Sequence, residues 1–80
     1  MKRGRTYRFE EIAGHAEQTG YDLTEYGNKA PGEGIVILQQ FIGKNPGRTI
    51  SIIFVLTGLN NYGNVYECVY TNEPMRIIDD

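Results

Sequence analysis

Residues 49–57 read Thr-Ile-Ser-Ile-Ile-Phe-Val-Leu-Thr, and this stretch decides the fold. Its β-branched and aromatic residues favour a strand. Because side chains alternate between the two faces of a strand, one face carries Ile50, Ile52, Phe54 and Leu56. The other face carries Ile53 and Val55. A strand that is apolar on both faces belongs at the centre of a sheet.

Two further apolar runs flank this strand in the sequence. Residues 35–42 and 65–71 are rich in branched or aromatic side chains, as strands are. The connecting segments, 43–48 and 58–64, are short and contain glycine and asparagine, which favour turns. Short connections join antiparallel neighbours, so residues 35–71 are predicted to form a β-meander.

A helical pattern precedes the strands. Within residues 7–19 the apolar side chains recur at the helical spacing i, i+3, i+4, i+7, at Phe9, Ile12, Ala13 and Ala16. Thr6 is the expected N-cap of this helix. Gly20 is expected to end it in the left-handed conformation that glycine adopts easily.

The segment between the helix and the first strand allows two interpretations. Tyr21, Leu23 and Tyr26 fit either a short strand or an irregular packed segment. Residues 28–34 contain a proline and two glycines and are expected to form a loop. The predicted fold class is α+β, with one N-terminal helix packed on a three- to four-stranded antiparallel β-meander.

The 80 residues are expected to form a single domain, because a chain of this length holds only one core. Residues 1–6 are predicted to be a basic N-terminal arm. Cys68 is the only cysteine, so no intramolecular disulfide can form and a reducing compartment fits best. No apolar run is long enough to span a membrane, and the start lacks the apolar region of a signal peptide. We therefore expect a cytoplasmic protein with no membrane partner.

The sequence predicts neither a catalytic nor a metal site. His15 falls on the polar side of the helix and is expected to be solvated. One cysteine and one histidine cannot supply a zinc site, and Asp22 and Glu25 are too isolated to form a calcium or magnesium loop. Cys68 is expected to be a structural thiol. We expect a protein that is not an enzyme and uses no cofactor; a pocket with titratable groups of perturbed pKa would favour the opposite interpretation.

Surplus apolar surface points instead to binding. One helix can cover only one face of the predicted sheet, and an uncovered apolar face is usually a contact surface. The chain has six tyrosines, a residue type enriched at interfaces. Alternation along residues 65–71 places Tyr66 and Tyr70 on one face, so the predicted protein-binding residues are Tyr62, Tyr66, Glu67 and Tyr70. Alternatively these rings pack beneath the helix and Ile53, Val55 and Val69 face outward.

The leading functional hypothesis is a small non-catalytic protein-binding module. Its partner is either a larger protein or a second copy of the chain, which would give a homodimer. With a net charge of −2, the chain suits a regulatory adaptor or an inhibitor that occludes a surface of a larger complex. A complex that handles nucleic acid is one such target, because acidic side chains can mimic phosphate charge.

The rival hypothesis is a single-stranded nucleic-acid-binding domain. Its phosphate contacts would come from the basic arm, Lys2, Arg3, Arg5 and Arg8, and its base stacking from the sheet tyrosines. The charges near Tyr66 and Tyr70 are acidic, at Glu67, Glu73, Asp79 and Asp80. Such charges repel phosphate, so nucleic acid is the less favoured partner.

Overall fold

The computed structural model describes residues 1–27, 32–43, 47–60 and 63–73. Within these ranges the chain forms one helix and five strands. In chain order they are β1 (Thr6–Arg8), α1 (Phe9–Thr19), β2 (Asp22–Tyr26), β3 (Ile35–Ile42), β4 (Arg48–Asn60) and β5 (Gly63–Thr71).

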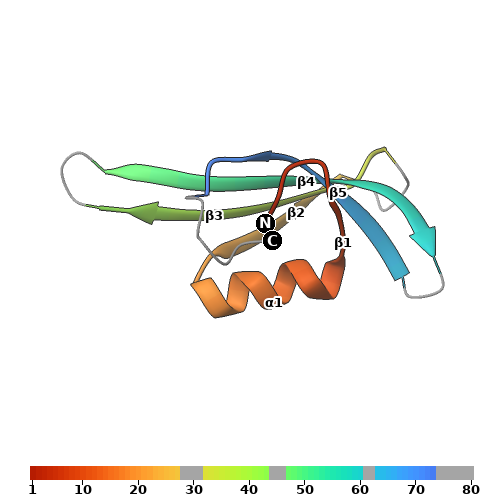
Figure 1. Cartoon of the computed structure of the whole chain (residues 1–80), viewed down its shortest axis with the longest axis horizontal. Coiled ribbons are helices and arrows are strands. Elements are labelled where there is room, and N and C mark those ends of the chain that lie inside the picture. The colour runs from red at the N-terminus through yellow and green to blue at the C-terminus, as the bar shows by residue number, and fades with distance from the viewer. Residues whose placement is uncertain (28–31, 44–46, 61–62, 74–80) are drawn as a thin grey trace.

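The five strands form one antiparallel sheet in the order β1-β5-β4-β3-β2. β4 pairs with β3 on one side and β5 on the other, so the strand with two apolar faces is central, as expected. Strands β2 to β5 follow one another as a meander, whereas β1 joins the far edge beside β5. Helix α1 therefore carries the chain across one face of the sheet, from one edge to the other (Figure 1).

The coarse prediction of an α+β fold, with one helix packed on an antiparallel sheet, is confirmed. The beginning of the chain differs from the prediction. Thr6 lies in β1 rather than at the helix N-cap, and α1 begins at Phe9 instead of residue 7. Arg8 is the N-cap, and its backbone N–H donates to Glu11 Oε1 at 2.8 Å. The glutamate thus satisfies a backbone donor at the helix start.

The other end of α1 and the segment after it resolve two further expectations. Gly20 has φ of 81°, in the left-handed region, and its N–H donates to Ala16 O at 2.8 Å, so the expected C-terminal glycine is confirmed. Tyr21 is buried, and residues 22–26 form the edge strand β2. Of the two interpretations of this segment, the short strand is the observed one.

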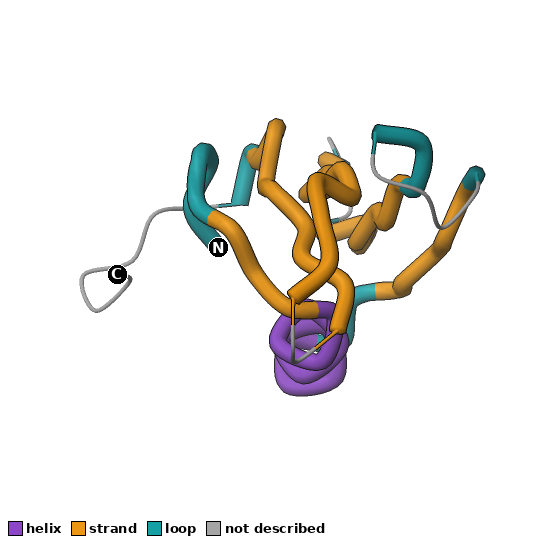
Figure 2. Tube along the Cα trace, turned by 90° about the vertical axis from the view of Figure 1, so that its right-hand side faces the viewer, coloured by secondary structure: helices purple, strands orange, loops and turns teal. Residues whose placement is uncertain are grey.

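The core lies between α1 and the sheet. Seen roughly along the helix in Figure 2, α1 lies against one side of the sheet. The buried apolar residues are Ile12, Ala16, Tyr21, Val36, Leu38, Ile50, Ile52, Phe54, Leu56, Tyr66 and Cys68. All four residues assigned to the first face of the central strand are thus buried on the helix side, and no described helix or strand lies on the opposite side.

A charge on this buried face of β4 should unfold the protein. Phe54 is fully buried, so Phe54→Asp places an unpaired carboxylate in the core at a cost of several kcal/mol, roughly the whole stability of a small domain. Thr49→Asp, at an exposed position of the same strand, is the matched control and should unfold cooperatively. Circular dichroism melting distinguishes them, and a cooperative Phe54→Asp transition would contradict the assigned facing.

Candidate binding surface

The face of the sheet opposite α1, here called the open face, is organised in rows set by the strand register. Pairing places one row across the sheet at Tyr26, Ile35, Val55 and Glu67. The next row holds Thr24, Ile37, Ile53 and Tyr70. A polar row of Asp22, Gln39 and Ser51 follows. The apolar side chains are therefore concentrated in two neighbouring rows.

We call the apolar part of these two rows the open-face patch: Tyr26, Ile35, Ile37, Ile53, Val55 and Tyr70. Its four aliphatic residues lie on the central strands β3 and β4 and are partly buried by one another and by their neighbours. The two tyrosines lie at its sides and are about half exposed, 53% for Tyr26 and 45% for Tyr70. A partner placed here would meet an apolar centre between two amphipathic rings.

A β-bulge in β5 separates the two tyrosines that were expected to share a face. Ile53 pairs with Tyr70 and Phe54 with Cys68, so Val69 is an extra residue in β5. The alternation shifts at this point, and the expectation of a shared face is wrong. Tyr66 lies on the helix side and is only 3% exposed, whereas Tyr70 lies on the open face. Tyr66 therefore has almost no surface to offer a partner there.

The other predicted contact residues are distributed as follows. Glu67 is partly buried beside the open-face patch, opposite Val55. Tyr62 lies outside the described residues. Ile53 and Val55 face outward, as the alternative expectation proposed, while Tyr26, Ile35 and Ile37 were not predicted. Strand register brings those three side chains to the patch. Identifying them requires the pairing of β2 with β3 and of β3 with β4, which the sequence alone does not give.

The residues of the basic arm are held against the sheet edge rather than gathered on the open face. Gly4 N–H donates to Cys68 O at 2.8 Å, and Cys68 N–H donates to Arg5 O at 3.0 Å. The Arg5 guanidinium lies 6.0 Å from the ring centre of Tyr7, whose hydroxyl accepts from the backbone N–H of Lys2. The Tyr7 ring in turn packs edge-on against Phe54 in the core.

Arg8, the last of the four predicted phosphate contacts, forms ion pairs on α1. Its guanidinium lies 2.8 Å from Glu10 and 3.6 Å from Glu11. Arg3 is exposed. Arg8 is therefore paired with carboxylates of its own helix.

A buried carboxylate joins four parts of the chain on the helix side. Glu73 Oε1 lies 2.6 Å from the Met1 ammonium, and Oε2 accepts from Tyr21 OH at 2.7 Å. His15 Nε2 lies 2.8 Å from the same oxygen, so the expectation of a solvated His15 is wrong. The Glu73 side chain is only 8% exposed. These contacts fix α1 and the start of β2 to the segment after β5.

The electrostatic environment of Glu73 favours its ionised form. Burial by itself raises the pKa of this carboxyl, but hydrogen bonds from the Met1 ammonium, Tyr21 and His15 outweigh burial and lower the pKa. The residues are far apart in sequence, and no local pattern links them.

The surroundings of the Cys68 thiol do not activate it. Burial raises the pKa of the Cys68 thiol, and its Sγ lies 3.6 Å from Tyr70 O. Such a thiol is a poor nucleophile. Within residues 1–27, 32–43, 47–60 and 63–73, no three histidine, cysteine or acidic side chains are grouped to hold a metal ion. In the same ranges no helix is long and apolar enough to cross a membrane.

Comparison with known proteins gives no relative: no family model matches the chain, and no curated protein or solved structure resembles it significantly.

The Glu73 contacts predict a pH-dependent contribution to stability. Since folding lowers the pKa of Glu73, its contribution is present above the unfolded value near 4.5 and is lost as pH falls through the folded value. At pH 7, Glu73→Gln should lower the free energy of unfolding by about 1–3 kcal/mol, because the replacement amide cannot match charged hydrogen bonds.

Urea unfolding of both proteins from neutral to acidic pH tests this expectation. The difference between wild type and Glu73→Gln should shrink as the pH falls below about 4.5. Glu17→Gln, at an exposed site of α1, is the control and should change stability by less than about 0.5 kcal/mol. A pH-independent difference would contradict the assigned role.

Proposed function

We propose that this chain is a small non-catalytic protein-binding module that contacts its partner through the open-face patch. The observation that carries the proposal is an apolar surface on the two central strands with no described helix or strand over it. Large exposed apolar patches on small domains usually mark interaction sites.

The side chains of the open-face patch suit binding energetically. Ile35, Ile37 and Ile53 are β-branched and stand on paired central strands, so little side-chain freedom is lost on contact. Tyr26 and Tyr70, each about half exposed, add aromatic area that carries polar hydroxyl groups. Tyrosine is among the residues that most often dominate interface energy.

Charge favours a different protein over a second copy as the partner. Asp22 and Glu67 border the open-face patch, and neither has an ion pair among the described residues. Two copies packed face to face would bring carboxylates into one interface with no basic side chain of the patch to pair them. We therefore infer an apolar partner surface bordered by lysine or arginine, with the homodimer as the competing assembly.

A regulatory role in the cytoplasm follows from this proposal. A module that covers an apolar, basic-rimmed surface of a larger protein acts as an adaptor or an inhibitor. Proteins that handle nucleic acid commonly present basic surfaces, so they are suitable targets. The single buried thiol of Cys68 suits a reducing compartment.

Binding of single-stranded nucleic acid is the competing function, and two observations disfavour it. Tyr66, one of the two rings assigned to base stacking, is buried in the core. The side chains bordering the exposed ring of Tyr70 and its patch include acidic Glu67 and Asp22. A stacking platform requires cations along its rim to follow the phosphates.

Variants of the open-face patch test the proposed function. Tyr70→Ala combined with Ile53→Ser should leave the domain folded and weaken partner binding at least tenfold, because truncating interface aromatics commonly costs about 2 kcal/mol or more. Leu59→Ala is the control, since Leu59 is 74% exposed on β4 but lies outside the patch. Quantitative affinity capture from the host cell and light scattering after size-exclusion chromatography measure partner binding and self-association.

Three outcomes are informative. Loss of one captured protein with the double variant but not with Leu59→Ala supports the proposal. A folded double variant that keeps every partner and the wild-type assembly state contradicts it. Salt-sensitive binding of a single-stranded oligonucleotide by the wild type would instead support the competing function.

A further inference from the structure

The open-face patch forms a band that runs across the strands rather than along them. Its residues occupy two neighbouring rows on four strands, from Tyr26 on β2 to Tyr70 on β5. Because side chains return to the same face at every second residue, the two rows are about 7 Å apart. The axes of β2 and β5 are three strand spacings apart, about 14 Å. The band is therefore about twice as long as it is wide.

The dimensions and borders of this band restrict what can cover it. A second sheet in the aligned packing mode would extend its contact along β3 and β4, over the polar row of Asp22, Gln39 and Ser51. An extended peptide would leave its backbone groups without partners, because a sheet face presents side chains and no hydrogen-bonding ladder. A helix satisfies its own backbone groups and is about 10–12 Å wide with side chains, so a single helix covers both rows.

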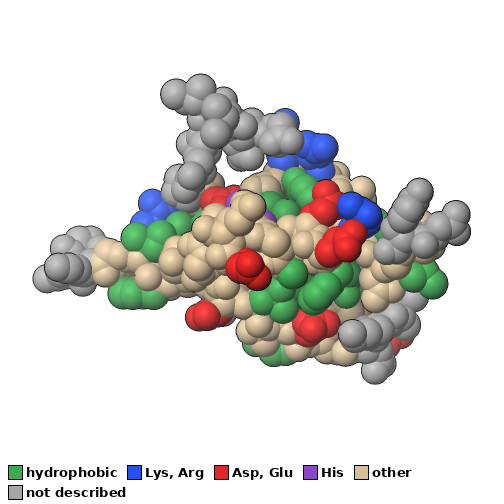
Figure 3. Space-filling model, turned by 90° about the horizontal axis from the view of Figure 1, so that it is seen from below, with side chains coloured by type: hydrophobic (Ala, Val, Ile, Leu, Met, Phe, Trp, Pro, Cys, Tyr) green, Lys and Arg blue, Asp and Glu red, His purple; other side chains and the backbone are tan. Residues whose placement is uncertain are grey.

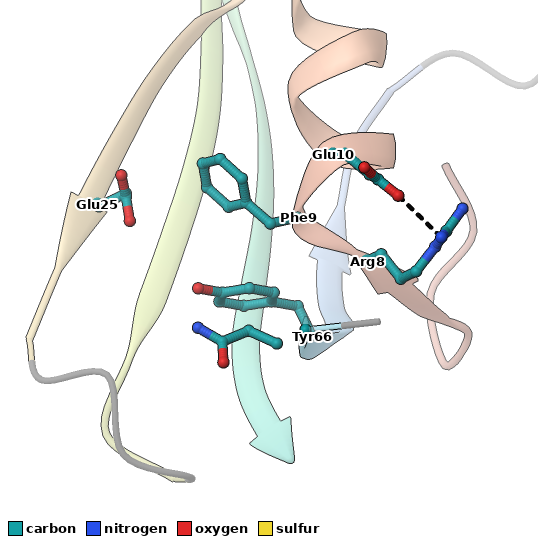
Figure 4. Close-up of a pocket in the computed structure, with 7 residues that line it drawn as sticks. Arg8, Phe9, Glu10, Glu25 and Tyr66 are labelled. Atoms are coloured by element: carbon teal, nitrogen blue, oxygen red, sulfur yellow. Dashed lines mark ion pairs between the residues drawn. The ribbon is translucent and has the colours of Figure 1, made fainter. Parts of the chain in front are cut away.

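The opposite side of the sheet shows a helix of the required length packed against these strands. α1 has 11 residues, and at 1.5 Å per residue it is about 16 Å long. Ile12 and Ala16 of α1 are buried, and the Phe9 ring centre lies 6.1 Å from that of Tyr66 (Figure 4). The pocket beside these rings has a volume of about 310 Å³, but Tyr66 is only 3% exposed there. The helix side is thus already filled, and the open face is the side with room for a second helix.

Two carboxylates border the band at its opposite ends. Glu67 ends the first row on β5, and Asp22 lies on β2 in the polar row. Across the sheet they are about 14 Å apart, which corresponds to helix positions separated by about nine or ten residues. Lysine or arginine at such positions would lie near both carboxylates. Acidic side chains also lie on the helix side (Figure 3), so the apolar band, and not charge alone, selects the open face.

We propose that the open-face patch receives one amphipathic helix of a partner protein, with an apolar stripe over the two rows and a basic residue near each end. This inference rests on the proposed function and specifies the shape of the partner. Grooves that receive one apolar helix face are a recurrent mode of recognition.

A second copy of the chain fits the band less well. The patch has six residues, whereas a stable interface buries about 800 Å² per partner and involves about 20–30 residues a side. The helix of a second copy also has the wrong charge, because α1 carries Glu10 and Glu11 in its first turn and no basic residue in its last. Both arguments favour the helix of a different protein.

Amide NMR titration of the whole chain with a designed peptide tests the proposal. The probe is a helix-forming peptide of about 14 residues with leucines along one stripe and two lysines about ten positions apart. It should shift the amide signals of Ile37, Ile53 and Tyr70 more than those of α1 and bind with a Kd on the order of 100 µM. A peptide of the same composition with leucine at every second position has no helical stripe and should bind at least about tenfold more weakly.

Two results of this titration would overturn the proposal. The first is equal affinity for the two peptides, since the helical stripe would then contribute nothing. The second is a set of shifts confined to α1 or to the edge strand β2, because the peptide would then lie outside the band.

Charge exchange tests the two carboxylates. Asp22→Lys and Glu67→Lys should each weaken the lysine peptide by about two- to fivefold and strengthen a version with glutamate in place of both lysines. Glu17→Lys makes the same change of charge at an exposed site of α1 and is the matched control, with an expected effect below about twofold on either peptide. Equal effects of Asp22→Lys and Glu17→Lys would contradict the assigned contacts.

The helix proposal and the proposed function fail in different ways. The variant Tyr70→Ala with Ile53→Ser should lose the peptide, which would support the helix proposal. If this variant loses a captured partner while the wild type binds no helical peptide, the helix proposal is overturned and the proposed function stands. A wild-type dimer that the same variant dissociates would make a second copy the occupant and would also overturn the helix proposal. A variant that keeps both the partner and the peptide contradicts both.

Discussion

The central strand β4 requires cover on both faces, and the rest of the structure follows from how that requirement is met. Ile52 and Phe54 project to one side, and Ile53 projects to the other. The chain has one helix among its described residues, so only one side receives a full layer. Because α1 joins β1 at one edge to β2 at the other, it crosses the sheet. It buries the side that carries Ile52 and Phe54. Apolar area that would otherwise be buried is left on the open face.

A single extra residue determines what that open face offers. Without the bulge at Val69, Tyr70 would project to the same side as Tyr66, toward the core. With it, the aromatic residues of β5 are divided: one completes the core and lines the pocket, and the other borders the open-face patch. Bulges are suited to redirecting one side chain without changing strand order. The bulge therefore adds Tyr70 to the open-face patch, while Tyr66, paired with Leu56, keeps its place in the core.

Sequence periodicity predicts the parts of this fold that local chemistry determines. The central strand is recognisable because its apolar residues, such as Ile52 and Phe54, recur at every second position. The helix is recognisable because its apolar residues, such as Ile12, recur at every third or fourth position. Strand β1 has only 3 residues and forms because Tyr7 pairs with Tyr66, a contact across 59 positions (66 − 7) that no local pattern encodes. The open-face patch was predictable only in part, since Ile53 followed from alternation but Tyr26 required the register.

The best-connected polar groups of the described residues serve the fold. A general base needs an accessible lone pair and room for a substrate beside it. Glu73 already accepts from the Met1 ammonium and Tyr21, and His15 Nε2 contacts the same carboxylate. These groups hold α1 to the sheet, and their hydrogen-bonding capacity is used in doing so. Among the described residues, the open-face patch is the apolar surface that stays accessible. Apolar area and aromatic rings recognise a partner without transforming it, and this is the physical basis of the proposed binding function.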